Sequence, residues 1–418
     1  MKLQKNHRNL QDLSLEKTMN WEKIATDLST ETSSKIILFV MDGLGGLPHR
    51  GKTALEAARS PHLDSLAARS ACGLTDPVFM GITPGSGPAH LSLFGYDPLK
   101  YTLGRGILEA LGVGVDVGTN DMVARGNFAT VREGLITDRR AGRIPTSQNE
   151  SLCEDINAFL RSREGSRIAV YPGKEHRFVI KFSGEDLSDA LSDADPQKEN
   201  KPRAYTRPLD EGAKKTANMV NSFLDDITEL LKDSAPANTV LLRGFSKYPS
   251  LPSLPDLTKL KPVALANYPM YKGLAKLVGM TVVEVGPTLA DLFDTLDKIY
   301  QDFDFFYIHV KKTDAAGEDG NFEAKKAAIE ETDAFIPRLE GKNAEVLVVT
   351  SDHSTPCLLK SHSWHPNPFL LHAQTAMPDS VTRFSERTCG QGYLGRFQAI
   401  YAMPLMLAHA GKLKKYGA

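Results

Sequence analysis

The sequence predicts an α/β fold: a mostly parallel sheet with helices on both faces, interrupted by a smaller inserted α/β domain. The first indication is a pair of short apolar runs, at 35–41 and 345–350, which both stop at an acidic residue followed by small or polar residues. Such runs are typical of buried strands in a parallel sheet. The second indication is a change of pattern between 121 and 262, where shorter strand-like and helical segments alternate around a polar loop.

Length and composition narrow the class of protein. A chain of 418 residues is too long to fold around one simple core and indicates roughly two domains. A net charge of −1 gives no electrostatic reason to expect binding to nucleic acid or to an anionic membrane. Four scattered cysteines without a CxxC pair favour a reducing compartment and no cysteine-based zinc site. No apolar run reaches the ~18–20 residues that cross a bilayer, and the polar amino terminus lacks a signal-peptide core. We expect a soluble, cytoplasmic protein, with homo-oligomer formation left open.

The chain is expected to divide into three parts. Residues 1–33 read as a polar, helical extension that ends at the helix-breaking TETSS. Residues 34–120 and 263–418 should form the main domain, and 121–262 an inserted substrate-binding lid. In the main domain the first strand, 35–41, precedes a helix with Pro61 at its start, where proline is favoured. The Gly/Pro-rich stretch 79–106 predicts a loop with unusual backbone conformations, typical of a site.

The remaining elements follow from apolar patterning. In the inserted part VARGNFATV, RFVIKF and TVLLRGF predict strands, and EDINAFLRS and DEGAKKTANMVNSFLDDITELL predict helices. A polar loop at 184–208 lies between them. After residue 263 the parallel-sheet pattern resumes with PVALANYP, TVVEV, FDFFYIHV and AEVLVV, with helices such as 321–339 between strands.

Three side chains stand at the ends of predicted strands that are more than 300 residues apart. Asp42 closes the first strand, and Asp352 and His353 follow the strand at 345–350. Ligands of open α/β sheets collect outside the carboxyl ends of the strands. We therefore expect these three residues to meet in space, although Asp-Gly after a strand also forms ordinary turns. The combination predicts a metal-dependent enzyme.

Ser86 lies between two glycines in the loop TPGSGPAH, just before a helix-like stretch. Such a turn lets the backbone approach an anion, and a helix amino terminus offers free N–H groups. The serine is a candidate nucleophile if coordination to a metal lowers the cost of losing its proton. A simple helix cap remains the alternative, and no GxSxG nucleophile elbow is present.

Further candidate ligands follow two later segments. Asp314 comes after the apolar strand FDFFYI, and Glu318 stands four residues on. His362 and His365 precede a proline-rich stretch that leads into another apolar strand, and for His365 we expect a structural role. Carboxylates and imidazoles spread over several strand ends suit Mg²⁺, Mn²⁺ or Zn²⁺. There are enough ligands for two metals, which suits in-line phosphoryl transfer.

The chain resembles the cofactor-independent (2,3-bisphosphoglycerate-independent) phosphoglycerate mutases of archaeal type, within the alkaline phosphatase superfamily. The resemblance covers nearly everything from residue 35 onward and rests on a long ordered series of motifs. These are VMDGLGG, KTALEAARSPHLDSLA, PGSGPAHLSLFGYDP, GRGILEALGVGVDV, ARGNFATV, DRRAGRI, GKEHRF, LSDADP, LLRGFSKYP, YPMYKGLAKLVGM, KKTDAAGEDG, TSDHSTP and HSWHP.

The resemblance implies catalytic and metal-binding roles. Ser86 matches the nucleophile that becomes phosphoserine. Asp42, Asp352 and His353 match the ligands of the metal that also binds this serine. The implied fold is an alkaline-phosphatase-like sheet, and the implied cofactors are two divalent cations, Mn²⁺ or Mg²⁺ with Zn²⁺ and Co²⁺ as alternatives. Neither bisphosphoglycerate nor a nucleotide is required.

The resemblance assigns other residues to the second metal and to the substrate. Asp314 and His362 match ligands of the second metal, and Lys272 matches a lysine near the nucleophile. Two positions depart from the family pattern: Glu318 replaces a histidine, which should favour harder cations, and Gly87 replaces an aspartate. Candidates for gripping the phosphate and carboxylate of phosphoglycerate are Arg125, Arg139, Arg140, Arg143, His176, Arg177 and Arg243.

The implied activity is interconversion of 3-phosphoglycerate and 2-phosphoglycerate, an isomerase reaction of glycolysis and gluconeogenesis that passes through phosphoserine. A phosphatase or phosphodiesterase on the same core is one alternative. Another is a phosphotransferase of the homoserine-kinase type, although neither GxxxxGK[ST] nor a GxGxxG at a strand–helix junction is present. A metal-binding scaffold without turnover is the non-enzyme alternative.

Overall fold

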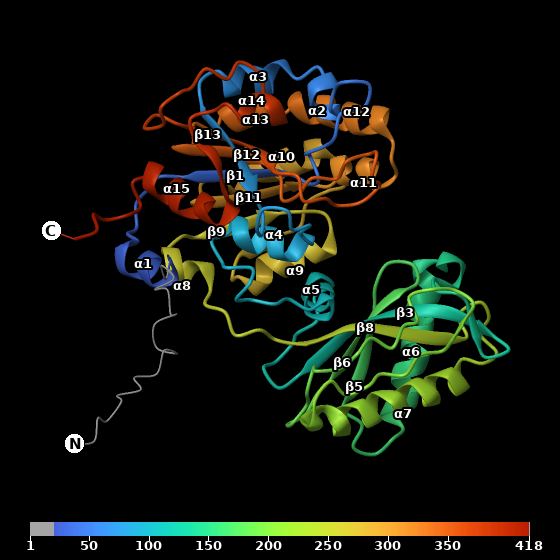
Figure 1. Cartoon of the computed structure of the whole chain (residues 1–418). Helices are drawn as coiled ribbons and strands as arrows, with labels where there is room; N and C mark the ends of the chain where they lie inside the picture. The colour runs from blue at the N-terminus through green and yellow to red at the C-terminus, as the bar shows by residue number, and fades with distance from the viewer. Residues whose placement is uncertain (1–20, 418) are drawn as a thin grey trace, which may run out of the picture.

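The computed structural model describes residues 21–417 and builds them around two separate sheets (Figure 1). The larger sheet holds the first and last parts of the chain, and the smaller one holds the middle part. Residues 1–20, most of the predicted extension, lie outside the described residues. Its last part forms helix α1, Trp21–Leu28. Among the helices described, none is both long and apolar enough to cross a membrane.

The larger sheet has the strand order β10-β9-β11-β1-β12-β13-β2-β14. Neighbouring strands are parallel except where β13 pairs with β12 and with β2. This arrangement confirms the predicted mostly parallel α/β sheet. The strands are β1 (Ile36–Met41), β2 (Ala71–Asp76), β9 (Pro262–Leu265), β10 (Thr281–Val283), β11 (Phe305–Val310), β12 (Val346–Thr350), β13 (Asn367–Ala373) and β14 (Gly395–Gln398).

Helices cover both faces of this sheet because its central strands are apolar on both sides. All six residues of β1 are buried, and alternate side chains enter two different apolar clusters. One cluster takes α4 (Ser86–Leu93), α5 (Arg105–Gly112), α8 (Leu254–Thr258), α9 (Pro269–Leu277) and α15 (Ala402–His409). The other takes α2 (Ala54–Ala57), α3 (Pro61–Ala67), α10 (Leu289–Ile299), α12 (Phe322–Asp333), α13 (Ile336–Glu340) and α14 (Glu386–Cys389).

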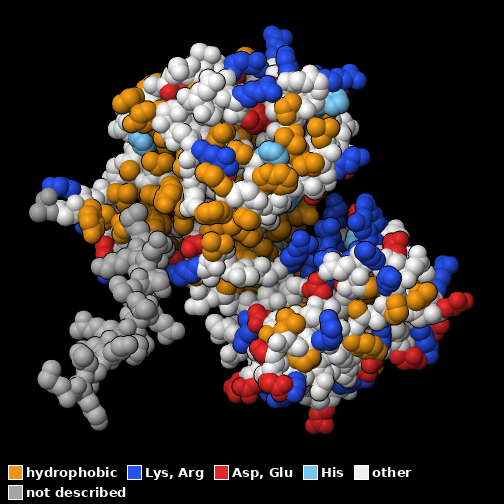
Figure 2. Space-filling view, viewed as in Figure 1, with side chains coloured by type: hydrophobic (Ala, Val, Ile, Leu, Met, Phe, Trp, Pro, Cys, Tyr) orange, Lys and Arg blue, Asp and Glu red, His pale blue; other side chains and the backbone are white. Residues whose placement is uncertain are grey.

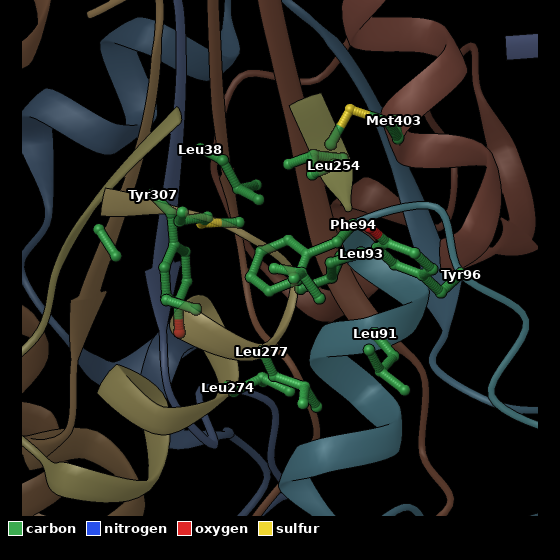
Figure 3. Close-up of a cluster of buried hydrophobic side chains, with 14 of the residues drawn as sticks. Leu38, Leu91, Leu93, Phe94, Tyr96, Leu254, Leu274, Leu277, Tyr307 and Met403 are labelled. Carbon is green, nitrogen blue, oxygen red and sulfur yellow. The ribbon is translucent and has the colours of Figure 1, made fainter. Parts of the chain in front are cut away.

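The first of these clusters anchors the helix that carries Ser86. Figure 3 shows Leu93 and Phe94, at the end of α4, in the same cluster of buried side chains as Leu38 of β1 and Tyr307 of β11. The ring centroids of Phe94 and Tyr307 are 5.0 Å apart in an edge-to-face arrangement. Burying one such side chain contributes about 1.5–3 kcal/mol. The position of α4 is therefore fixed by apolar packing, independently of any ligand.

The smaller sheet is antiparallel and has its own apolar core, formed with two long helices, α6 (Thr146–Arg161) and α7 (Lys214–Leu230). We call residues 122–247 the lid, after the role predicted for the inserted domain at 121–262. Its strand order is β5-β6-β3-β4-β7, and β8 also pairs with β3. The strands are β3 (Met122–Arg132), β4 (Leu135–Asp138), β5 (Ile168–Pro172), β6 (Arg177–Phe182), β7 (Lys201–Pro202) and β8 (Thr239–Lys247).

The chain enters and leaves the lid at one place. Met122, the first residue of β3, is the ladder partner of Lys247, the last residue of β8. Leu254, Leu257 and Leu260 follow this exit and pack in the apolar cluster of the larger sheet. The chain therefore passes into the lid and out of it along two paired strands, β3 and β8, which form one two-stranded connection to the larger sheet.

One helix differs from the sequence prediction. The segment 321–339 was expected to be a single helix, but α12 ends at Asp333 and α13 begins at Ile336. Pro337 is the second residue of α13. A continuous helix would place the proline ring against the carbonyl of residue 333 and remove one hydrogen bond, so the helix breaks before the proline.

Helices α5 and α9 approach each other closely through glycines. A Cβ on Gly273 of α9 would lie 2.0 Å from the Leu108 carbonyl oxygen, and a Cβ on Gly112 of α5 would lie 2.1 Å from the Pro269 carbonyl oxygen. Helix α5 also packs against β3 and β8 of the lid. These glycines therefore set the spacing between the lid connection and α9.

We expect Gly273→Ala to lower the free energy of unfolding by about 2 kcal/mol or more, because the added methyl group would overlap backbone atoms of α5 that cannot move aside. Urea unfolding followed by circular dichroism measures the change. Gly184→Ala is the control, since a Cβ there meets nothing within 4 Å. Equal stabilities for the two variants would contradict the close helix contact.

Candidate active site

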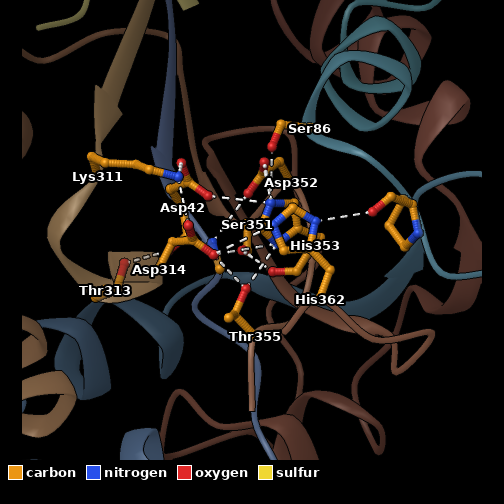
Figure 4. Close-up of polar contacts among 12 residues, drawn as sticks. Asp42, Ser86, Lys311, Thr313, Asp314, Ser351, Asp352, His353, Thr355 and His362 are labelled. Atoms are coloured by element: carbon orange, nitrogen blue, oxygen red, sulfur yellow. Dashed lines mark hydrogen bonds and ion pairs between the residues drawn. The ribbon is translucent and has the colours of Figure 1, made fainter. Parts of the chain in front are cut away.

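The predicted strand ends meet at the carboxyl edge of the larger sheet (Figure 4). Strands β11, β1 and β12 are adjacent and parallel, so the residues that follow them lie side by side. Asp42 comes directly after β1, and Asp352 and His353 come after β12. Asp314 lies in the first turn of α11 (Lys312–Glu318), which follows β11. The structure therefore brings together side chains from three loops that are distant in the sequence.

Asp42, Asp352 and His353 form the first cluster. Their ligand atoms all lie within 4.8 Å of one another. His353 Nε2 is 3.3 Å from Asp42 Oδ1 and 3.1 Å from Asp352 Oδ2. All three side chains are buried, with at most 1% exposure. The arrangement offers two carboxylate oxygens and one imidazole nitrogen to a single point.

Asp314, His353 and His362 form the second cluster, which shares His353 with the first. Asp314 Oδ1 is 3.9 Å from His353 Nδ1 and 3.8 Å from His362 Nε2. The two imidazole rings stack with centroids 3.6 Å apart. Glu318 Oε1 is 3.9 Å from His362 Nε2, but its side chain is half exposed and it does not belong to the cluster of mutually close ligand atoms. Glu318 stays a predicted ligand at the rim.

Ser86 borders both clusters as the first residue of α4. Its Oγ is 3.2 Å from His353 Nε2. Gly85 precedes it as the N-cap in an extended conformation, so the first-turn N–H groups point away from the helix and can meet an anion. The loop before it is tied to the second cluster, because His362 Nδ1 is 3.1 Å from the Pro84 carbonyl oxygen.

The structure gives a reason for glycine at position 87. A Cβ there would lie 3.3 Å from Leu108 Cδ1 and 3.8 Å from Leu103 Cδ1. A carboxylate at this position would therefore start its side chain toward apolar groups, where an unpaired charge is costly. His365, expected to be structural, lies 3.0 Å from Ser363 Oγ and stacks on Trp364.

Several neighbours of the clusters were not predicted. Tyr271 donates a hydrogen bond to Asp42 Oδ2, and His309 Nε2 lies 3.1 Å from the same oxygen. Lys311 Nζ lies 3.0 Å from Asp42 Oδ2, 2.5 Å from Asp314 Oδ2 and 3.2 Å from the Tyr271 hydroxyl. Their positions in the sequence could have indicated a place near the site. His309 and Lys311 stand in the string that leads to Asp314, and Tyr271 precedes Lys272.

The charges of the first cluster suit a cation. Burial, followed by the negative charge of Asp42, raises the pKa of Asp352 well above its usual range. Burial also lowers the pKa of His353 well below its usual range, so its imidazole is neutral and able to ligate. Asp42 Oδ1 and Asp352 Oδ2 are buried without a hydrogen-bond partner. Two unpaired buried carboxylate oxygens beside a neutral imidazole fit a divalent metal ion.

For Lys272, predicted to lie near the nucleophile, the structure records an acidic partner outside the two clusters. Its ammonium pairs with Glu284 at 2.6 Å, and the Glu284 side chain is largely exposed. The neighbouring Tyr271 is the residue of α9 that reaches Asp42, since successive positions on a helix face different directions. The lysine found among the carboxylates is Lys311.

Several predicted substrate-binding residues gather on the lid. The Nε atoms of Arg125 and Arg177 and Nδ1 of His176 are buried without a hydrogen-bond partner. Burial and the positive charges of Arg177, Arg105 and Arg243 lower the pKa of Arg125. Figure 2 shows Lys and Arg side chains massed where the lid faces the larger sheet. Buried guanidinium nitrogens without a partner, on arginines that repel one another, are suited to an anion.

The other predicted arginines have different surroundings. Arg139 forms a two-bond ion pair with Asp195, at 3.0 and 2.6 Å, and Arg243 lies 3.4 Å from Asp193 and 3.5 Å from Asp195. Arg140 and Arg143 are exposed on a turn in which residues 141–143 all have positive φ. Both carboxylate oxygens of Asp138 accept backbone N–H groups of this turn.

This sheet, with a serine, carboxylates and histidines at its carboxyl edge, defines an α/β enzyme with a candidate metal centre. The chain belongs to the 2,3-bisphosphoglycerate-independent phosphoglycerate mutase family, which confirms the resemblance found in the sequence. The model of this family matches residues 67–238.

The relatives cover almost the whole chain. A protein of Thermosipho africanus named "Probable 2,3-bisphosphoglycerate-independent phosphoglycerate mutase" is 55% identical over 95% of this chain and 99% of its own. A protein of Thermotoga maritima with the same name is 53% identical with the same coverage. The solved structure of the cofactor-independent phosphoglycerate mutase from Thermoplasma acidophilum matches with a TM-score of 0.67 and 31% identity, over 90% of this chain and 100% of that one.

Proposed function

We propose that the protein is a phosphoglycerate mutase that interconverts 3-phosphoglycerate and 2-phosphoglycerate without bisphosphoglycerate or a nucleotide. The observation that carries the proposal is the position of Ser86, whose Oγ lies 3.2 Å from the histidine shared by two candidate metal clusters. Full-length relatedness to proteins named for this activity supports the same substrate.

The lid holds the substrate in this proposal. Arg125, His176 and Arg177 each present one buried ring or guanidinium nitrogen without a hydrogen-bond partner, and such nitrogens match a phosphate or carboxylate. Arg139 and Arg243 already have acidic partners and orient the lid loop that contains Asp193 and Asp195. Arg140 and Arg143 are exposed, and we assign them to the carboxylate end of the substrate.

Phosphoryl transfer takes place in two halves. Ser86 Oγ attacks phosphorus, the bond between phosphorus and the C3 oxygen of glycerate breaks, and phosphoserine and glycerate result. The proton lost by Ser86 balances the proton gained by the C3 oxygen. Glycerate then turns, its C2 hydroxyl attacks the phosphoserine, and the same proton exchange runs in reverse. Both steps are in-line displacements with little net charge change.

The chain's own residues prepare this chemistry. Asp42, Asp352 and His353 would hold one metal and Asp314, His353 and His362 the other, with Ser86 and Glu318 at their edges. Two bound divalent ions would supply positive charge that favours ionisation of a nearby hydroxyl and offsets charge on transferring oxygens. Mn²⁺ and Mg²⁺ suit this oxygen-rich set. Lys311 provides a further positive charge that belongs to the protein itself.

Water must be kept out while glycerate turns, because it would hydrolyse the phosphoserine. The lid already contacts the larger sheet near the site, where Arg177 Nη1 donates to the Tyr268 hydroxyl at 3.2 Å. Lid movement about the single two-stranded connection would complete the enclosure.

Phosphorus NMR of Mn²⁺- or Mg²⁺-loaded protein mixed with 3-phosphoglycerate, with no bisphosphoglycerate or nucleotide added, tests the proposal. Because Mn²⁺ broadens the signals, the products are read after quenching and chelation. We expect 2-phosphoglycerate with little inorganic phosphate. Release of inorganic phosphate alone would assign a hydrolase, and an unchanged substrate across several divalent metals would overturn the substrate assignment.

Arg125→Met should raise KM for 3-phosphoglycerate by about 100-fold, because the loss of a buried charged donor removes roughly 2–3 kcal/mol of substrate binding. Mn²⁺ affinity should stay unchanged. Arg139→Met is the matched control: it removes an arginine that is paired with Asp195, so it should lower lid stability with a smaller change in KM. A larger KM effect at Arg139 would contradict this division of roles.

A further inference from the structure

A lysine lies buried beneath the candidate metal centre. Lys325 belongs to α12, and its side chain is only 1% exposed. Its Nζ donates to three backbone carbonyl oxygens, those of Gly43 at 2.7 Å, Gly45 at 3.0 Å and Thr355 at 2.9 Å. An ammonium is the one side-chain group that carries three N–H donors on a single atom. Three converging carbonyls therefore select lysine at this position.

The three carbonyls belong to the two loops that carry the first cluster. Gly43 and Gly45 follow Asp42, and Thr355 follows Asp352 and His353. The loops are also bound to each other: Gly43 N–H donates to Asp352 Oδ1 at 3.1 Å, and Thr355 N–H donates to the Gly45 carbonyl oxygen at 3.0 Å. Lys325 adds a third connection, because its Nζ donates to carbonyl oxygens of both loops.

The same lysine reaches the second cluster through Thr355. The Thr355 hydroxyl donates to Asp314 Oδ1 and lies 3.1 Å from His353 Nδ1. The Thr355 side chain thus touches the ligand shared by the two clusters and a ligand of the second cluster alone. A shift of the Thr355 backbone would move its contacts to both.

A buried carboxylate, that of Glu386, lies on the other side of the loop that follows Asp42. Glu386 accepts the Gly46 N–H at 2.9 Å and the Thr53 hydroxyl at 2.8 Å. A Cβ on Gly46 would lie 3.8 Å from Glu386 Oε1 and 3.9 Å from Lys325 Nζ, so the two charged groups flank this glycine. The loop after Asp42 is held from both sides by opposite charges.

We propose that Lys325 is a positioning residue that fixes the ligand geometry of both metal clusters without contacting metal or substrate. The inference rests on the metal-binding part of the proposed function, and it is independent of which molecule accepts the phosphoryl group. Outer contacts that orient ligands typically change metal affinity by about 10–100-fold when they are removed.

A purely structural role for Lys325 makes a different prediction, and Lys412 supplies the comparison. Lys412 is also 1% exposed, and its Nζ donates to the Thr32 carbonyl oxygen at 3.0 Å and to Asp304 Oδ2 at 3.1 Å. Asp304 precedes β11, so this contact lies at the opposite edge of the sheet from the site. Loss of either lysine removes a buried ammonium and its hydrogen bonds, so both losses should destabilise the fold.

The experiment measures Mn²⁺ binding to metal-stripped full-length protein without substrate, by calorimetry and by electron paramagnetic resonance, together with Tm. Lys325→Met and Lys412→Met should both lower Tm. Lys325→Met should weaken Mn²⁺ binding at both sites by at least about tenfold. Lys412→Met should bind Mn²⁺ within about twofold of wild type, because distant sites act independently. Wild-type Mn²⁺ affinity in folded Lys325→Met would overturn the inference.

If Lys325→Met does not fold, Lys325→Gln decides, since its amide keeps two donors but no charge. It should show weaker Mn²⁺ binding than wild type, and unchanged binding would overturn the inference. The proposed function fails separately: wild-type protein that binds no Mn²⁺ would contradict the metal centre itself, and wild-type protein that binds Mn²⁺ but leaves 3-phosphoglycerate unchanged would contradict only the substrate.

Discussion

Ser86→Ala is expected to abolish mutase activity, with a loss of about 10⁴-fold or more, because no other group can replace the nucleophile in a double-displacement reaction. The variant should fold normally, since apolar contacts of Leu91, Leu93 and Phe94 hold α4 in place. Turnover is measured by the formation of 2-phosphoglycerate. Mass spectrometry of quenched wild-type enzyme should show one added phosphoryl group, absent from the variant.

Ser92→Ala is the matched control. Ser92 is a second buried serine on the same helix, at 2% exposure, and it should retain near wild-type turnover. If Ser86→Ala were still to interconvert the phosphoglycerates at a comparable rate, direct transfer without a covalent serine intermediate would replace the proposed mechanism.

Asp314→Ala should reduce the number of bound Mn²⁺ ions from two to one and lower turnover by about 10³-fold. Asp314 is fully buried and belongs only to the second cluster, so the first cluster keeps all its ligand atoms. Lys311 would at the same time lose one of its two carboxylate partners. Calorimetric titration of metal-stripped protein gives the stoichiometry, and the mutase assay gives the rate.

Asp319→Ala serves as the comparison for this variant, because Asp319 is an exposed acidic residue at the C-cap of the same helix. It should bind two Mn²⁺ ions and turn over normally. Intact activity in Asp314→Ala with one metal lost would rule out a two-metal reaction.

The larger sheet could be predicted because its central strands are apolar on both faces and end at acidic residues. Asp42, Asp352 and His353 were placed together from that pattern alone, and the structure brings them together. The break between α12 and α13 was missed because the helical periodicity continues through it and only Pro337 marks it.

Contacts that depend on side-chain direction could not be derived from the sequence. Lys272 and Tyr271 are neighbours in the chain, yet only Tyr271 faces Asp42, because their helix fixes which of them points inward. Likewise nothing in the sequence distinguishes Arg125, which lacks an acidic partner near its buried Nε, from Arg139, which has Asp195. Such pairings arise from tertiary packing of loops distant in the chain.

The single strand pair that joins the lid to the larger sheet has a consequence for how this architecture can change. Met122 and Lys247 are adjacent in space, so the whole segment between them could be exchanged for another unit at one point of the gene. Such an exchange would leave Asp42, Ser86 and Asp352 in place. In the proposed division of roles, the sheet holds the phosphoryl chemistry and the lid holds the acceptor, so a new acceptor could be recruited without rebuilding the metal centre.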